Sequence, residues 1–148
     1  MRKPLRVILD SSFLFTSAQF RIDVFEELAK VLTQHFEPVV LSSTCHELEK
    51  IMKKRSVKLQ RQAALAMNLA QQCSRLKVKK GNAESYDDVI VRVASKMKYC
   101  AATNDRVLRK KLRQKNVAVI YLRQKSHLAI DGYIPQNQIP KKTLDVYQ

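Results

Sequence analysis

Residues 99–122, YCAATNDRVLRKKLRQKNVAVIYL, contain two short apolar runs separated by one helix-forming segment. The runs at 99–102 and 117–122 have the composition of buried strands, and the second is the clearest strand pattern in the chain. Between them, Asn104 can cap a helix with Asp105 in its first turn and with apolar residues at helical spacing, namely Val107, Leu108 and Leu112. A strand, a helix and a second strand in succession predict a parallel strand pair joined by a crossover helix.

The same alternation extends over most of the chain. Strands are predicted at 5–9, followed by a turn at 10–12, and at 38–41. Helices are predicted at 22–36, at 42–76 with an interruption near Ser56, and at 85–98. Near-continuous apolar strands between helices indicate a three-layer α/β/α domain with a central, mainly parallel sheet over residues 1–134. Residues 135–148, which contain two prolines and Lys141-Lys142, are expected to be a basic, loosely held tail.

Length and charge limit what this protein can do. A chain of 148 residues builds one domain of ordinary size. Its 28 Lys and Arg residues outnumber 13 Asp and Glu, and the formal charge of +15 indicates a polyanionic partner, with nucleic acid foremost. Only two glycines are present, which excludes glycine-rich phosphate-binding loops.

The cysteines and apolar segments bear on the compartment. Three widely spaced cysteines form neither a disulfide framework nor a paired metal-binding motif, which favours a reducing compartment. Asp10 interrupts the N-terminal apolar run too early for a signal peptide, and no stretch approaches the roughly 18 apolar residues of a membrane span. We therefore expect a cytoplasmic protein without a membrane partner.

Acidic side chains follow two of the predicted strands. Asp10 comes directly after the strand at 5–9, and Asp105 comes shortly after the strand at 99–102. In open α/β sheets, ligands bind beyond the carboxyl ends of the strands, so both carboxylates are expected at one crevice. Each also has a purely structural explanation, because Asp10 suits a turn with Ser12 and Asp105 suits the first turn of a helix.

Two further acids lie near the predicted starts of helices. Asp87 shares a helix face with Ile90 and Ala94, so it is expected to point inward, where an unpaired charge is costly. Asp88 is expected on the surface, with Ser85 as a cap and Arg92 as an ion-pair partner.

Glu47 borders an apolar helix face, although Thr44-x-x-Glu47 is also a capping box. Four carboxylates can thus gather around one crevice, at Asp10, Glu47, Asp87 and Asp105. Such a set of oxygen ligands suits Mg²⁺ or Mn²⁺.

The sequence blocks around these acids resemble, in order and spacing, the four acidic motifs of PIN-domain nucleases. The blocks are ILDSSFL at 8–14, ELE at 47–49, DDVI at 87–90 and ATNDRVL at 102–108. Residues 18–20, 23–28 and 120–125 are most similar to archaeal single-domain proteins related to pre-ribosomal RNA cleavage factors.

The resemblance implies a function for these residues. Asp10, Glu47, Asp87 and Asp105 would be the catalytic, metal-binding residues of a Mg- or Mn-dependent endoribonuclease, with Ser12, Asp88 and Thr103 near the site. Ser12 departs from the Asn common in the family. The implied substrate is RNA, specifically a ribosomal RNA precursor, and relatives often form homodimers. Two alternatives stay open: an inactive RNA-binding scaffold in ribosome assembly, and the toxin of a toxin-antitoxin pair.

The basic helix after Asp105 is the predicted RNA-binding surface. Helical spacing places Arg106, Arg109 and Arg113 along one stripe, with Lys110 beside it. Lys and Arg contacts to phosphates supply affinity that does not depend on base sequence. We expect these four side chains to be exposed and to guide RNA toward the carboxylates.

Overall fold

The structure is a computed structural model that describes residues 3–135. Within these residues, six strands form one sheet in the order β3-β2-β1-β4-β5-β6. All neighbouring strands are parallel except β5 and β6, which are antiparallel. The strands are β1 (Leu5–Leu9), β2 (Phe36–Leu41), β3 (Ser74–Leu76), β4 (Cys100–Ala102), β5 (Val119–Arg123) and β6 (His127–Asp131). The predicted mainly parallel sheet is confirmed.

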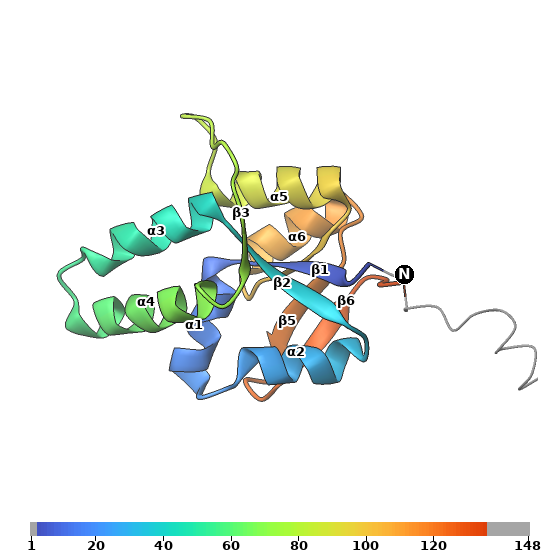
Figure 1. Cartoon of the computed structure of the whole chain (residues 1–148), viewed down its shortest axis with the longest axis horizontal. Coiled ribbons are helices and arrows are strands. Elements are labelled where there is room, and N and C mark those ends of the chain that lie inside the picture. Colours follow the sequence, from blue (N-terminus) through green and yellow to red (C-terminus); the bar gives the residue numbers. More distant parts are fainter. Residues whose placement is uncertain (1–2, 136–148) are drawn as a thin grey trace, which may run out of the picture.

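Helices cover both faces of this sheet (Figure 1). They are α1 (Ser11–Phe20), α2 (Val24–Leu32), α3 (Ser42–Met52), α4 (Val57–Ala70), α5 (Tyr86–Met97) and α6 (Arg106–Gln114). Residues of α1, α2 and α4 share one core cluster, and residues of α5 and α6 share the other. The predicted three-layer α/β/α arrangement is therefore confirmed.

The two cores follow from the alternation of side chains along each strand. In β1, Val7 and Leu9 pack into the cluster with α1, α2 and α4, whereas Ile8 between them packs into the cluster with α5 and α6. All three side chains are fully buried. Strands that are buried on both faces read as continuous apolar runs, which is why β1 was recognisable from sequence.

The first helix differs from the prediction. Ser11 and Ser12 begin α1 directly after Asp10, where the sequence predicted a turn. Four consecutive residues of α1, Phe13 through Thr16, are buried. A helix buried on several sides shows no amphipathic periodicity, so its sequence does not reveal it.

The long helix predicted at 42–76 is divided. It breaks at the predicted place, because α3 ends at Met52 and Ser56 caps α4 by accepting a hydrogen bond from the Leu59 amide at 3.2 Å. It also ends earlier than predicted: α4 stops at Ala70, and residues 74–76 form the edge strand β3. Strand β6 was not predicted, because Leu128 is its only fully buried residue.

Three further predictions concern the chain as a whole. All three cysteines are free thiols, as expected. No helix within residues 3–135 combines the length and apolar character needed to cross a bilayer. The predicted tail at 135–148 lies outside the described residues except for Pro135, so it stays a prediction.

Candidate active site

The four predicted acids approach one another at the carboxyl ends of the central strands. Asp10 follows β1, Asp105 follows β4, Asp87 is in the first turn of α5, and Glu47 is in α3, which begins directly after β2. Their charges influence one another. Asp10 and Asp105 help to raise the pKa of Asp87, and Asp10 and Asp87 help to raise the pKa of Glu47. The four acids are therefore close enough for their charges to interact, whereas their role as a metal-binding site stays a prediction.

Asp10 is the best fixed of the four carboxylates. Its side chain is 4% exposed and accepts hydrogen bonds from Ser12 Oγ at 2.6 Å and Thr103 Oγ1 at 2.7 Å. These two hydroxyls also accept backbone hydrogen bonds, Ser12 Oγ from the Asn104 amide and Thr103 Oγ1 from the Asp105 amide, each at 3.1 Å. Asp10 therefore joins the start of α1 to the loop between β4 and α6, and both hydroxyls predicted near the site contact it.

Asp105, rather than Asn104, caps α6. Asp105 Oδ1 accepts hydrogen bonds from the amides of Val107 at 2.8 Å and Leu108 at 3.2 Å. Within residues 3–135, no donor is bonded to Oδ2. The structural explanation is therefore confirmed in the form of a helix cap made by one oxygen, and metal binding by the other oxygen stays a prediction.

Asn104, which the sequence predicted as the cap of α6, has a different structural role. Its Oδ1 accepts a hydrogen bond from the Leu122 amide at 2.9 Å, and its Nδ2 donates to Thr16 Oγ1. These bonds tie β5 to α1 across the site. A polar residue directly after a strand was the available signal, but its partner Thr16 lies in the helix that the sequence did not reveal.

Glu47 does not form the predicted capping box. Helix α3 begins at Ser42, so Thr44 lies inside the helix and not at its cap position. The helix has no side-chain cap, and Thr44 is buried. Glu47 is half-buried, and burial raises the pKa of its carboxyl, an effect that the neighbouring Ser11 hydroxyl partly offsets. The structural alternative for Glu47 is therefore wrong, and its carboxylate is free to face the cluster.

Asp87 and Asp88 point in different directions, as helical spacing predicted. Asp87 is half-buried, and burial, followed by the charges of Asp10 and Asp105, raises the pKa of its carboxyl to about 6. Asp88 is exposed, and its amide donates to Ser85 Oγ at 3.0 Å. One detail is wrong: Asp88 pairs with Lys111 at 3.2 Å, whereas Arg92 pairs with Glu84.

Asp88→Asn is expected to cost little stability, because an exposed ion pair beside a helix cap contributes little. Cleavage activity should largely persist, since the Asp88 side chain points away from the cluster. Urea denaturation and a cleavage assay on the purified variant measure both quantities. If Asp88→Asn is inactive and Asp87→Asn is active, then Asp88 and not Asp87 belongs to the active site.

Two of the predicted RNA-binding arginines are not freely exposed. Asp131 in β6 pairs with Arg109 Nε at 2.8 Å and with Arg113 Nε at 3.2 Å. The Arg109 guanidinium also lies 3.6 Å from the centre of the Tyr121 ring. The predicted exposure of these two side chains is wrong, because the unpredicted strand β6 supplies an acid beside α6. Arg106 and Lys110 are exposed as expected.

A small cavity opens beside the fixed hydroxyls. It has a volume of about 190 Å³ and is lined by Thr103, Asn104, Arg106, Arg109 and residues 121–124. No acidic residue lines it, and three of its residues are arginines. We call it the arginine cavity. Two of its lining residues, Thr103 and Asn104, also belong to the hydrogen-bond network around Asp10.

The chemistry of the cluster fits a hard divalent cation. Its donors are carboxylate oxygens, which Mg²⁺ and Mn²⁺ prefer. Two of its members have raised pKa values because they are buried near like charges, a strain that a bound cation would relieve. Within residues 3–135, no three acidic, histidine or cysteine side chains already converge as a ligand set.

Comparison with known proteins identifies the family of this chain. Residues 7–125 match the family described as PIN like domain. The chain belongs to this family. As a PIN-like protein it is 30% identical over 130 residues to ribonuclease VapC4 of Methanocaldococcus jannaschii, an alignment that covers 87% of this chain and 98% of the relative. The predicted resemblance to PIN-domain nucleases is therefore confirmed.

Solved structures show the same PIN-like fold. The PIN domain endonuclease Utp24 superposes with a TM-score of 0.72 at 24% identity, covering 91% of this chain and 97% of that one. A domain of a functionally unknown protein from Methanocaldococcus jannaschii gives a TM-score of 0.61 at 11% identity, covering 91% and 99%. At these identities the likeness concerns the fold.

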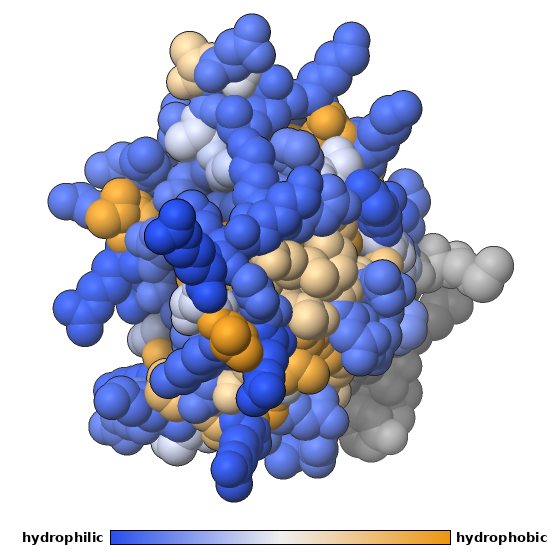
Figure 2. Space-filling model, turned by 90° about the vertical axis from the view of Figure 1, so that its left-hand side faces the viewer, coloured by the Kyte–Doolittle hydropathy of each residue, from blue (hydrophilic) through white to orange (hydrophobic). Residues whose placement is uncertain are grey.

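One face of the PIN-like domain is mostly hydrophilic. Figure 2 shows the side toward which α3 and α4 project, with hydrophilic side chains surrounding a smaller central group of apolar ones. With a formal charge of +15 for the whole chain, such a surface is suited to a polyanion.

Proposed function

We propose that this PIN-like protein is a divalent-metal-dependent endoribonuclease whose substrate is a ribosomal RNA precursor. The observation that supports it best is the convergence of Asp10, Glu47, Asp87 and Asp105 at the carboxyl edge of the sheet. The similarity to a ribonuclease over 130 residues supports the substrate class. The ribosomal precursor rests on the sequence resemblance described above.

The proposed residues have distinct tasks. A divalent ion held by the four carboxylates would supply Lewis acidity toward water and the scissile phosphate. Ser12 and Thr103 hold Asp10 in one orientation through their hydroxyl hydrogen bonds. Arg106, exposed at the arginine cavity, binds a phosphate of the RNA strand beside the carboxylates.

The proposed reaction is hydrolysis of the phosphodiester bond. Water oxygen bonds to phosphorus, the bond from phosphorus to the 3′ oxygen breaks, and that oxygen takes up a proton. The products are a 5′-phosphate and a 3′-hydroxyl. No histidine is needed, because the carboxylates act as ligands rather than as proton carriers.

Metal removal tests the proposal. Cleavage of a labelled single-stranded RNA is expected in Mg²⁺ or Mn²⁺ and is expected to disappear in excess EDTA, because clustered carboxylates alone repel the phosphate. End-labelling of the products should detect the 5′-phosphate. Equal cleavage in excess chelator would contradict a metal-dependent mechanism.

The alternatives predict other outcomes. An inactive scaffold would bind RNA in every metal without cutting it. A toxin would be encoded beside a small partner gene that blocks its activity when coexpressed. Homodimer formation also stays a prediction, and light scattering of the purified chain measures it directly.

A further inference from the structure

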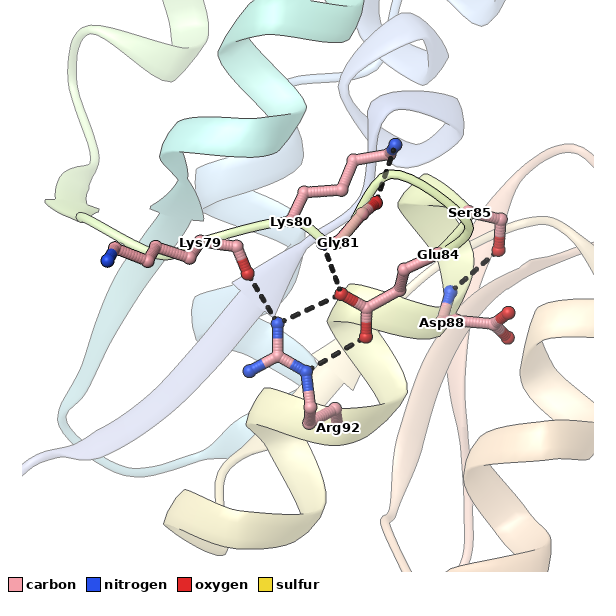
Figure 3. A network of polar contacts seen from close by, with 7 residues as sticks. All are labelled: Lys79, Lys80, Gly81, Glu84, Ser85, Asp88 and Arg92. Carbon is pink, nitrogen blue, oxygen red and sulfur yellow. Dashed lines mark hydrogen bonds and ion pairs between the residues drawn. The ribbon is translucent and has the colours of Figure 1, made fainter.

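The basic connector between β3 and α5, residues 77–85, is held in one conformation by a polar network (Figure 3). Arg92 in α5 donates to Glu84 through Nε at 2.9 Å and Nη2 at 3.1 Å, and Nη2 also donates to the Lys79 carbonyl at 2.6 Å. Glu84 Oε1 accepts from the Gly81 amide at 3.1 Å. One guanidinium therefore fixes both the middle and the end of the connector.

A second contact fixes the start of the connector. The Val78 amide donates to Ser42 Oγ at 2.9 Å, and this hydroxyl donates to the Val78 carbonyl at 3.2 Å. Ser42 is the first residue of α3. The connector is thus attached to α3 at one end and to α5 at the other, and both of these helices contribute acids to the proposed active site.

One lysine of the connector and one lysine of α3 lie near the same tyrosine. Lys80 Nζ lies 5.2 Å from the centre of the Tyr86 ring, and Lys50 Nζ of α3 lies 5.6 Å from it. Tyr86 immediately precedes Asp87. Within residues 3–135, neither lysine forms an ion pair with an acid.

This arrangement is favourable for an anion. Two ammonium groups near one half-buried ring concentrate positive charge there, and the ring attracts each of them only weakly. A phosphate bound by both lysines would neutralise this charge, because lysine binds phosphate as a compact point charge. A connector that is already ordered also loses little conformational freedom on binding.

We propose that Lys50, Lys80 and Tyr86 form a phosphate-binding site for the RNA strand, with Glu84 and Arg92 as positioning residues. This inference rests on the proposed function. The strand order separates the new site from the arginine cavity: Lys50 belongs to the helix after β2, on one side of β1, whereas the cavity lies at the ends of β4 and β5, on the other. RNA bound at both sites would cross the carboxylates.

Binding of a fluorescein-labelled single-stranded RNA in EDTA tests the two lysines without cleavage. Lys50→Gln and Lys80→Gln are each expected to weaken binding about 3- to 10-fold and to lower the salt-dependence slope by about one, as for one lost phosphate contact. Lys96→Gln is the matched control, since this exposed lysine lies at the other end of α5 from Tyr86. It should change affinity less than about twofold.

Glu84→Gln separates positioning from net charge. Removing a negative charge alone should strengthen RNA binding, because the protein becomes more positive. Loss of the Arg92 contacts should instead release the connector and weaken binding about 3-fold, and adding Lys80→Gln to Glu84→Gln should then have little further effect. Thermal melts verify that each variant is folded.

Each outcome decides one claim. Lysine variants that behave like Lys96→Gln, in a protein whose wild type binds and cleaves RNA, would overturn the phosphate site and leave the proposed function intact. Tighter binding by Glu84→Gln would overturn the positioning role. A wild-type protein that neither binds nor cleaves RNA would overturn the proposed function as well.

Discussion

Asp87→Asn is expected to reduce RNA cleavage by at least about 100-fold. Loss of a residue that only supports a metal ligand costs about 10- to 100-fold, and Asp87 is proposed as a ligand itself. Asp87 is the half-buried acid of α5, and its carboxyl lies in the field of Asp10 and Asp105. An amide of the same shape keeps the packing but lacks the charge that a cation requires. A single-turnover cleavage assay with saturating Mn²⁺ measures the loss.

The same substitution is expected to stabilise the metal-free protein. Burial and the neighbouring carboxylates raise the pKa of Asp87 to about 6 from an ordinary value of 3.8. The folded state therefore binds more protons than the unfolded state between these values, and wild-type stability falls as pH rises through this window. Asp87→Asn should gain about 1 to 2 kcal/mol at pH 7.5, and this gain should vanish near pH 4.

Urea denaturation in EDTA at several pH values measures this gain. Asp88→Asn is the matched control, because Lys111 lowers the pKa of the Asp88 carboxyl and the sign is opposite. Asp88→Asn should therefore lose a little stability at neutral pH. An Asp87→Asn protein that is less stable than wild type at pH 7.5 would contradict the assigned repulsion.

Charge reversal of Arg109 and Arg113 together is expected to destabilise the fold by about 2 to 4 kcal/mol, because both partly buried ion pairs are lost. Both guanidiniums pair with Asp131, and Arg109 also packs on Tyr121. Two glutamates at these positions would face Asp131 with like charge and remove the anchor between α6 and the β5–β6 hairpin. The midpoint of urea denaturation measures the effect.

Arg106→Glu is the comparison on the same helix. Arg106 is exposed and has no ion-pair partner within residues 3–135. Its reversal should leave the denaturation midpoint nearly unchanged while weakening RNA binding. If the double variant of Arg109 and Arg113 is as stable as wild type, Asp131 is not the anchor that its geometry indicates.

The sequence was sufficient to predict the parallel core of the sheet. Strands β1, β2, β4 and β5 are short apolar runs, because helices cover them on both faces. Each of the four predicted acids follows one of these strands or lies near the start of a helix. Their approach to one another was predictable because parallel strands end at the same edge of the sheet.

The edges and the polar partners were not predictable in the same way. Strand β3 has only three residues, two of them exposed, and β6 buries Leu128 alone, so neither shows strand periodicity. Because β6 was not predicted, Asp131 was not recognised as the ion-pair partner of Arg109 and Arg113, and both arginines were predicted to be exposed. Partners such as Thr16 for Asn104 depend on the tertiary arrangement, which local sequence patterns do not contain.

The bond between Thr103 and Asp10 also bears on how activity appears during folding. The two residues are 93 positions apart in the chain, and they follow the paired strands β1 and β4. Contacts of such separation form late, because a long loop must close first. A growing chain on the ribosome therefore has no complete acid cluster until residue 105 has left the exit tunnel. A nuclease that used this cluster would be unable to cleave RNA before that point of its own synthesis.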